Sequence, residues 1–380
     1  MPSESRNVTT VLAANPTRLP VSVLTGFLGS GKTTLLSRLV RHPGMANTAV
    51  IINEFGEIGL DHLLVAESSE NTVLLNSGCL CCTVRGDLID TMRDLFLKRV
   101  RGEIPEFDRV VIETTGLADP APVLHTLMND PLIAARFRLD GVITTVDAVN
   151  GADQLDRHQE SVKQAAVADR IVLTKTDIAA PEALAGLERR LAGLNPAAPL
   201  MRAVQGEIDP AGLFDAGLYN PTTKSPDVER WLRAEAYGDD HGHGDHGHGD
   251  HGHGDHGHGD HDHHGHGHDH HGHDRNRHDD HISAFCMTVE EPLAWEGFAT
   301  WIETLITLRG PDLLRIKGIL NVRESDTPVV VHGVQHVFHP PVRLEAWPSD
   351  DHRSRIVFIT RDVSRETIEA MFEAYRDASE

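Results

Sequence analysis

The segment at residues 26–34, GFLGSGKTT, constrains the fold of this chain more than any other part of its sequence. It satisfies the pattern G-x-x-x-x-G-K-[ST], directly after an apolar run, PVSVLT, and directly before a helical pattern. A strand, a glycine-rich turn and a helix in this order form a loop whose backbone N–H groups surround phosphate groups, while the helix N-terminus adds partial positive charge. The sequence therefore predicts a nucleotide-binding domain that contains a P-loop.

The residues of this loop have separate expected roles around a bound nucleotide. We expect Lys32 to reach the β- and γ-phosphates and Thr33 to ligate Mg²⁺, so both are candidate catalytic residues. The alternative, a chance glycine-rich turn, is disfavoured by the strand and helix that flank the loop. The loop residues that we expect to contact the nucleotide are Gly26, Gly29, Ser30, Gly31, Lys32, Thr33 and Thr34.

Apolar runs alternate with helical patterns through the first 205 residues. The runs are rich in Val and Ile and mostly continuous, which is typical of strands buried on both faces of a parallel sheet. We therefore expect an α/β fold with a mainly parallel, doubly wound sheet. The expected strands span residues 20–26, 48–54, 71–76, 108–114, 140–147, 169–175 and 199–204, and the expected helices include 32–41, 88–101 and 154–168.

Two further motifs follow expected strands. In ETTGLADP, Glu113 is a candidate catalytic residue that holds the Mg²⁺ shell or a water, and Gly116 allows a backbone N–H to meet the γ-phosphate. In TKTD, Lys175 and Asp177 are expected to contact a guanine base, as in the Asn-Lys-x-Asp pattern of many GTPases, although Thr174 replaces the Asn. The alternative for each motif is an ordinary polar turn at a strand end.

Three of the four cysteines, Cys79, Cys81 and Cys82, lie within four consecutive positions. Thiolates suit Zn²⁺ or Cu(I), and C-x-C-C differs from the paired C-x₂₋₄-C units of closed structural zinc sites. Three thiolates leave a tetrahedral ion one open position, which suits a metal that has to leave again. The alternatives are a redox pair, which the spacing disfavours, and buried small residues, which is how we interpret Cys286.

The segment NEFGEIGLD follows the second expected strand, where a P-loop protein has its first nucleotide-responsive segment. Glu54 and Glu57 are candidates for a fourth zinc ligand or for sensing Mg²⁺, and Glu57 is the one that we assign to zinc. A solvated acidic loop is the alternative.

The alternation of strands and helices stops near Tyr237, and HGHGD then repeats four times at residues 241–260. Residues 239–281 hold 18 of the 26 histidines. A segment with nothing to bury cannot offset the entropy of ordering, so we expect residues 237–281 to be a disordered insert. Neutral imidazoles bind Zn²⁺, Ni²⁺ and Co²⁺, which favours a weak metal store over a solubilising linker. The ligands that we assign to this store are His241, His243, His246 and His248.

Ordered structure is expected to resume after the insert as a small α+β domain. Strands are expected at residues 319–324, 328–334 and 354–360, and the last helix has Ser364 as its expected N-cap. The expected organisation is a disordered arm at 1–19, a nucleotide-binding domain at 20–236, the His-rich insert at 237–281 and the C-terminal domain at 282–380.

The formal net charge of −22 argues against a nucleic-acid partner, because phosphate binding needs a basic surface. The N-terminus lacks the pattern of a signal peptide, and no apolar run is long enough to span a bilayer. We therefore expect a cytoplasmic protein with no membrane partner, in a compartment where thiols stay reduced. A homodimer is an arrangement that the sequence leaves open.

Taken in their order along the chain, GFLGSGKTT, NEFGEIGLD, NSGCLCCTVRGDL, ETTGLADP and TKTD resemble the CobW-type GTPases, a branch of the P-loop proteins that serves metal centres. The later segments LLRIKGILNV and HGVQHVFHPP are similar to the C-terminal domain of that family. The resemblance covers nearly all of the chain except the first 20 residues and the His-rich insert, and such inserts are common in the family.

The resemblance implies a GTP-dependent zinc metallochaperone. Zinc is then expected on Cys79, Cys81 and Cys82, with GTP and Mg²⁺ at the P-loop, and GTP hydrolysis is expected to drive zinc transfer to a client metalloenzyme. Within the family, the alternatives are cobalt delivery for cobalamin synthesis and activation of a nitrile hydratase with iron or cobalt. Outside it, the alternatives are a passive zinc-storage protein and a small-molecule kinase.

Overall fold

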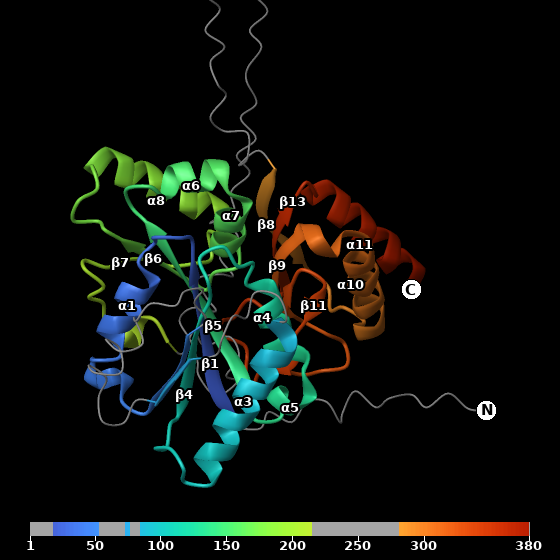
Figure 1. Ribbon diagram of the computed structural model, residues 1–380. Helices are drawn as coiled ribbons and strands as arrows, with labels where there is room; N and C mark the ends of the chain where they lie inside the picture. Colours follow the sequence, from blue (N-terminus) through green and yellow to red (C-terminus); the bar gives the residue numbers. More distant parts are fainter. Residues whose placement is uncertain (1–17, 53–72, 77–83, 215–280, 380) are drawn as a thin grey trace, which may run out of the picture.

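The computed structural model describes residues 18–52, 73–76, 84–214 and 281–379. These residues form two β-sheets, each with helices packed against it (Figure 1). The expected arm and insert lie outside the described residues, apart from residues 18, 19 and 281. Among the described helices, none combines the length and the apolar character that crossing a membrane requires.

The first sheet has seven strands in the order β3-β2-β4-β1-β5-β6-β7, and all neighbouring strands are parallel. This confirms the predicted α/β class. The strand order reverses at β1, so the carboxyl end of β1 opens into the crevice where such sheets bind ligands. The strands are β1 (Leu19–Gly26), β2 (Thr48–Ile52), β3 (Val73–Asn76), β4 (Arg109–Glu113), β5 (Phe137–Asp147), β6 (Arg170–Thr174) and β7 (Leu200–Arg202).

Both faces of this sheet are buried, as the continuous apolar runs predict. Along β4, Val110 and Ile112 pack in one core with α3 and α4, while Val111 packs in the other core with α1. The helices and 3₁₀ turns are α1 (Lys32–Leu39), η2 (Pro43–Met45), α3 (Val84–Val100), α4 (Ala121–Asn129), α5 (Pro131–Ala134), α6 (Gly151–Arg157), α7 (Gln159–Ala166), α8 (Pro181–Leu194) and η3 (Pro210–Gly212).

The single helix expected at residues 154–168 is wrong, because the chain forms two helices there, α6 and α7. They are separated by His158, whose backbone is extended at φ −129° and ψ 109°. The His158 ring stacks on the ring of Phe27 in the P-loop, with 4.4 Å between the centroids. A tertiary contact therefore accompanies a break that the helical pattern of the sequence does not indicate.

The second sheet is antiparallel, with the order β11-β10-β9-β13-β8 and β12 paired with β10. With its two helices it forms the expected small α+β domain. Ser364 is confirmed as the N-cap, since its Oγ accepts from the Thr367 N–H at 3.3 Å. The elements are β8 (Ile282–Val289), α10 (Trp295–Arg309), η5 (Gly310–Asp312), β9 (Leu313–Leu320), β10 (Val329–Val334), β11 (Val337–Phe338), β12 (Val342–Arg343), β13 (Ser354–Arg361) and α11 (Arg365–Ser379).

The strand expected at residues 319–324 is wrong in position, because the strand is β9. All eight residues of β9 are buried, including Arg315 and Lys317. The run LLRIKGIL contains two charged residues, and charged residues are almost never fully buried unless they are paired. The sequence pattern therefore does not indicate that this strand is buried. The partner of Arg315 and Lys317, Asp169, lies in the first domain.

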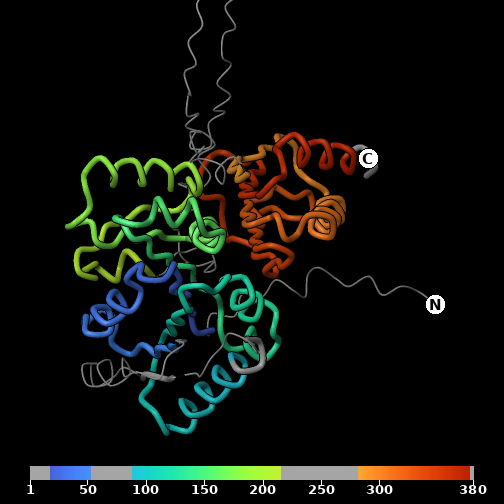
Figure 2. The backbone as a smooth tube through the Cα atoms, turned by 45° about the horizontal axis from the view of Figure 1, so that its top comes forward, coloured from blue at the N-terminus to red at the C-terminus, as the bar shows by residue number. Residues whose placement is uncertain are grey.

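The two sheets share a continuous apolar core. One face of the second sheet packs on α10 and α11 around Trp301, and the other face contributes Ile319 and Val330 to the core that contains Val21 of β1. In Figure 2 the orange and red C-terminal domain lies against the green part of the nucleotide-binding domain. The two domains are therefore joined by packed side chains as well as by the chain.

Asp169 is the charged centre of this domain interface. Its carboxylate accepts from Lys317 Nζ at 2.6 Å and pairs with Arg315, and it is buried together with both cations. Burial alone raises the pKa of this carboxyl, but the two cations outweigh burial and hold the pKa well below its usual range. Burial, with Arg315 adding to it, lowers the pKa of Lys317 to about 7.

Asp169→Asn is expected to lower the free energy of unfolding by about 3–5 kcal/mol, because it leaves buried cations without a counter-charge. A shift of the urea midpoint, measured by tryptophan fluorescence, would report the change. Glu188→Gln breaks the exposed Glu188–Arg202 pair and is the matched control, for which we expect no measurable shift. Equal midpoints for the two variants would contradict a stabilising role of Asp169.

Candidate functional site

The P-loop connects β1 to α1, and two of its glycines meet steric demands that other residues cannot. Gly26 has φ +142°, and a Cβ there would lie 2.8 Å from Ser30 Oγ and closer still to Thr145. Gly31 has φ +87° and directly precedes the first residue of α1. The chain can therefore turn tightly from the sheet into the helix only with glycine at these positions.

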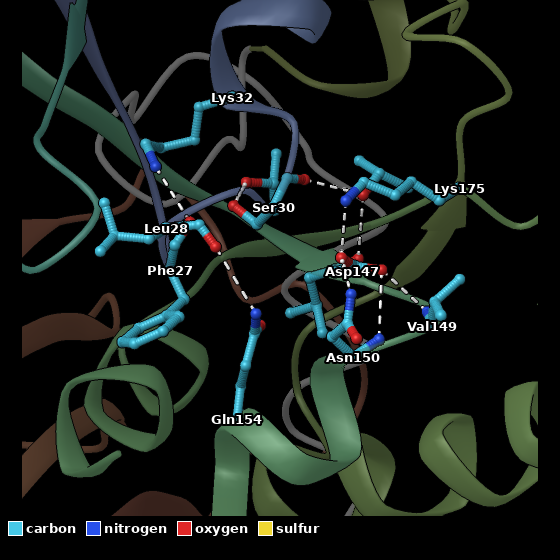
Figure 3. Close-up of polar contacts among 12 residues, drawn as sticks. Phe27, Leu28, Ser30, Lys32, Asp147, Val149, Asn150, Gln154 and Lys175 are labelled. Atoms are coloured by element: carbon cyan, nitrogen blue, oxygen red, sulfur yellow. Dashed lines mark hydrogen bonds and ion pairs between the residues drawn. The ribbon is translucent and has the colours of Figure 1, made fainter. Parts of the chain in front are cut away.

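Lys32 lies at the start of α1, and its side chain folds back over the loop (Figure 3). Its Nζ donates to the carbonyl oxygens of Gly26 at 2.9 Å and Phe27 at 3.1 Å, and the residue is buried. The ammonium group therefore lies within the cradle that the loop forms. Phosphate oxygens entering this cradle could replace the two carbonyls as acceptors.

Thr33 and Glu113 come together although 80 residues separate them in sequence. The Thr33 hydroxyl donates to Glu113 Oε1 at 2.9 Å, and Glu113 is buried at the carboxyl end of β4. A hydroxyl and a carboxylate are oxygen ligands of the kind that Mg²⁺ prefers. The donor set therefore fits the magnesium site expected from the sequence.

The turn after Glu113 packs directly on the P-loop. A Cβ on Gly116 would lie 2.7 Å from Leu28 N and 2.8 Å from Leu28 Cα, so only glycine fits this approach. The Thr114 hydroxyl also donates to the Thr25 hydroxyl at 2.8 Å, which joins the ends of β4 and β1. The structure thus brings the turn that contains Gly116 against Leu28 of the P-loop.

Lys175 is held by a residue that the sequence reasoning missed. Asp147, buried at the end of β5, accepts from Lys175 Nζ at 2.7 Å and from the Val149 N–H at 2.8 Å (Figure 3). Burial raises the pKa of the Asp147 carboxyl, but hydrogen bonds from Lys175, Val149 and Asn150 outweigh burial and lower the pKa overall. Asp177 follows Lys175 by two residues and is exposed, so its carboxylate is free to face a ligand.

Thr174, which replaces the Asn of the guanine-binding pattern, contacts the loop instead of solvent. Its hydroxyl donates to the Ser30 carbonyl at 2.7 Å, and its side chain packs against Gly31. This residue therefore ties β6 to the P-loop. Ser30 is itself anchored to β5, because its hydroxyl lies 2.6 Å from the hydroxyl of Thr145.

Gln164 of α7 is another residue that the sequence reasoning missed. It is fully buried, and its Nε2 donates to the carbonyl oxygens of Gly116 at 3.2 Å and Ala118 at 3.0 Å. A helical pattern cannot indicate this contact, because Gln in a helix usually faces solvent.

The candidate ligands for zinc and for the His-rich store lie outside the described residues. This applies to Glu54, Glu57, Cys79, Cys81, Cys82, His241, His243, His246 and His248. Within the described part of the chain, no three His, Cys, Asp or Glu residues are grouped closely enough to hold a metal ion. Cys286 is buried, as interpreted from the sequence, and burial raises the pKa of its thiol.

Family models match both domains. Residues 20–202 match the model described as "CobW/HypB/UreG, nucleotide-binding domain". Residues 282–376 match the model described as "Cobalamin synthesis protein cobW C-terminal domain". The two matches occur in the order that the sequence resemblance indicates.

Individual relatives also indicate the CobW family. The chain is 30% identical over 360 residues to the zinc chaperone YjiA of Escherichia coli, covering 94% of this chain and 99% of the relative. It is 31% identical over 264 residues to the zinc chaperone CobW of a Sinorhizobium species, covering 62% and 73%. The crystal structure of Zn(II)-bound YjiA GTPase from E. coli superposes with a TM-score of 0.65 at 27% identity, covering 94% and 99%. The chain is therefore a GTPase of the CobW family, with a P-loop nucleotide-binding domain followed by a CobW C-terminal domain.

Proposed function

We propose that this protein is a cytoplasmic, GTP-dependent zinc metallochaperone, which binds zinc at its C-x-C-C motif and transfers it to a client metalloenzyme during GTP hydrolysis. The names of its relatives support the metal, since YjiA and CobW are both called zinc chaperones. A third relative, from Schizosaccharomyces pombe, is called a zinc-regulated GTPase metalloprotein activator. Thiolates are also ligands that suit zinc.

One observation carries the proposed coupling between zinc and GTP: the register of three parallel strands. The last residue of β3, Asn76, pairs with Ile52 at the end of β2, and Ile52 pairs with Glu113 at the end of β4. Neighbouring strands lie roughly 4.8 Å apart, so the backbone of Asn76 lies roughly 10 Å from the backbone of Glu113. Cys79 follows three residues later and can extend at most roughly 11 Å farther.

The same register supports Glu57 as the fourth zinc ligand. The segment that contains Glu57 leaves β2 between the ends of β3 and β4, because Ile52 pairs with both strands. We therefore propose that the Glu57 carboxylate completes the zinc site of the three cysteines. We assign His241, His243, His246 and His248 to a separate, weaker store, because imidazoles alone bind zinc less tightly than several thiolates do.

The residues of the P-loop domain carry the chemistry of GTP hydrolysis. We assign Lys32 to the β- and γ-phosphates, Gly116 to the γ-phosphate, and Lys175 and Asp177 to guanine. The contacts of Lys32, Gly116 and Lys175 with the loop and with Asp147 support this assignment. Thr33 and Glu113 would hold Mg²⁺, which neutralises charge on the phosphates when it is bound. Loss of the γ-phosphate then removes the group that orders the segments after β2 and β4.

If zinc and GTP stabilise the same arrangement of these segments, each raises the affinity for the other by an equal factor. We therefore expect zinc to bind about 5–150-fold more tightly with a non-hydrolysable GTP analogue than with GDP. Competition titration against a chelating dye, at fixed Mg²⁺, measures this ratio. Equal zinc affinities in the two nucleotide states would exclude the coupling and would leave a passive zinc store as the better description.

A further inference from the structure

The carboxylate of Asp119 joins the nucleotide site to the C-terminal domain. Asp119 directly follows the turn ETTGLA, and its Oδ1 accepts from the N–H of Ala121, the first residue of α4, at 2.9 Å. Its Oδ2 accepts from Lys163 Nζ of α7 at 2.9 Å and from Gln335 Nε2 of the C-terminal domain at 3.3 Å. One oxygen atom is therefore shared by the two domains.

The backbone conformation of Gln335 and one backbone hydrogen bond fix its position. It lies in the turn between β10 and β11 with φ +53°, a left-handed conformation that costs energy for a residue other than glycine. Its N–H donates to the Leu313 carbonyl at 2.8 Å, which fixes the turn to β9. Glycine would adopt this conformation at less cost, so the presence of a glutamine here is consistent with a role for its side chain.

The whole tip of this turn docks on α4. The Nε2 atom of His125 in α4 lies 3.0 Å from the Val334 carbonyl oxygen, and the His125 ring packs edge-on against the His336 ring at 4.5 Å between centroids. These contacts lie on the same helix whose first residue, Ala121, donates to Asp119. The C-terminal domain thus fixes the position of α4 together with the turn that precedes it.

The other end of this contact chain reaches the P-loop. Only Leu117 and Ala118 separate Gly116 from Asp119, and Gly116 packs on Leu28 with no room for a side chain. Gln164 and Lys163, adjacent on α7, hold the two ends of this short segment. A shift of Asp119 must therefore be passed on to Gly116 or taken up within two residues.

We propose that Gln335 is a positioning residue for GTP hydrolysis: through Asp119, the C-terminal domain sets the position of the Gly116 turn against the P-loop. The inference rests on the GTPase activity of the family and is independent of zinc binding at the cysteine motif. A partner that binds the C-terminal domain and moves the β10–β11 turn would change the hydrolysis rate by the same route.

Gln335→Asn and Gln335→Glu are expected to lower kcat and leave KM for GTP unchanged, because Lys32, Lys175 and Asp177 are not affected. Gln335→Asn suits the left-handed backbone but is one methylene shorter, so kcat should fall about three- to tenfold on loss of one hydrogen bond. Gln335→Glu sets a like charge against Asp119, and its kcat should fall farther. Gln335→Lys restores a donor of sufficient length and should keep kcat within about twofold of the parent value.

The experiment measures GTP turnover of the full chain in zinc-free buffer containing Mg²⁺, with the thermal midpoint of each variant as a check on folding. Repeating the Gln335→Asn substitution in an Asp119→Asn background should remove its effect on kcat, since the two residues act through one contact. Undiminished kcat in Gln335→Asn, or equal reductions with and without Asp119, would overturn the proposal. If Gln335→Asn is unstable, equal kcat for the Glu and Lys variants, which differ in charge at the same position, would overturn it as well.

Discussion

Lys32→Ala is expected to lower kcat/KM for GTP hydrolysis by at least about a hundredfold. Lys32 is buried in the P-loop, and its Nζ is held by two carbonyl oxygens at 2.9 and 3.1 Å, so its position is set before a nucleotide binds. Alanine removes the charge that offsets the charge developing on the phosphates during transfer. Removing one preorganised donor from such a site typically costs about 10²–10³ in rate.

A phosphate-release assay, combined with titration of a fluorescent GTP analogue, separates loss of turnover from loss of binding. Lys98→Ala is the matched control, because Lys98 is exposed on α3. We expect parental turnover from it. Turnover of Lys32→Ala within about threefold of the parent protein would show that the phosphates bind elsewhere. Turnover that is lost on this substitution would also exclude a zinc store with a vestigial nucleotide site.

The parts of the site that could be predicted from the sequence are those that local structure determines. The P-loop is one strand, one turn and one helix, so its glycines, Lys32 and Thr33 are specified within nine consecutive residues. Glu113 could be assigned because a buried strand of a parallel sheet delivers its last residue to the same edge as the loop. In both cases the position of the residue follows from the order of strands and helices along the chain and from the rule that parallel strands end at one edge of the sheet.

The residues that sequence reasoning missed act through tertiary contacts. Asp147 matters because it meets Lys175 from a neighbouring strand, and Gln164 because α7 crosses the Gly116 turn. The break at His158 goes with stacking on Phe27, and the charged residues of β9 are buried because Asp169 lies opposite them. No pattern within a single element carries such information, because each contact joins segments from different parts of the chain.

The shared core limits how a nucleotide signal can reach the C-terminal domain. Separation of the two domains would expose Ile319, Val330 and Val21 and leave Asp169 away from its cations, at a cost that binding of one phosphate group does not readily offset. A local rearrangement at the Asp119–Gln335 contact requires no such exposure. We therefore expect the response to GTP in the described part of the chain to be concentrated around α4 and the β10–β11 turn.

Replacing Cys79, Cys81 and Cys82 together by serine is expected to weaken the tight zinc site by more than about a hundredfold. Changes to residues that only support metal ligands already cost about 10–100-fold in affinity, and serine does not supply a soft thiolate at neutral pH. We expect the fold to persist, because serine is close to cysteine in size, and the thermal midpoint of the variant checks this. Zinc affinity is measured by competition with a chelating dye, and transfer by the rate at which a second chelator acquires zinc during GTP turnover.

Deletion of residues 239–280 provides the matched control, because it removes most of the histidines and keeps the three cysteines. We expect this variant to bind fewer zinc ions in total, to keep the tight site, and to retain GTP-dependent transfer. Protonation of imidazoles below about pH 6.5 should release zinc from the parent protein's weak sites, and the deletion variant should lack that release step. Tight binding that survives in the serine variant, or that disappears with the histidines, would assign the transferred zinc to the His-rich segment instead of the cysteine motif.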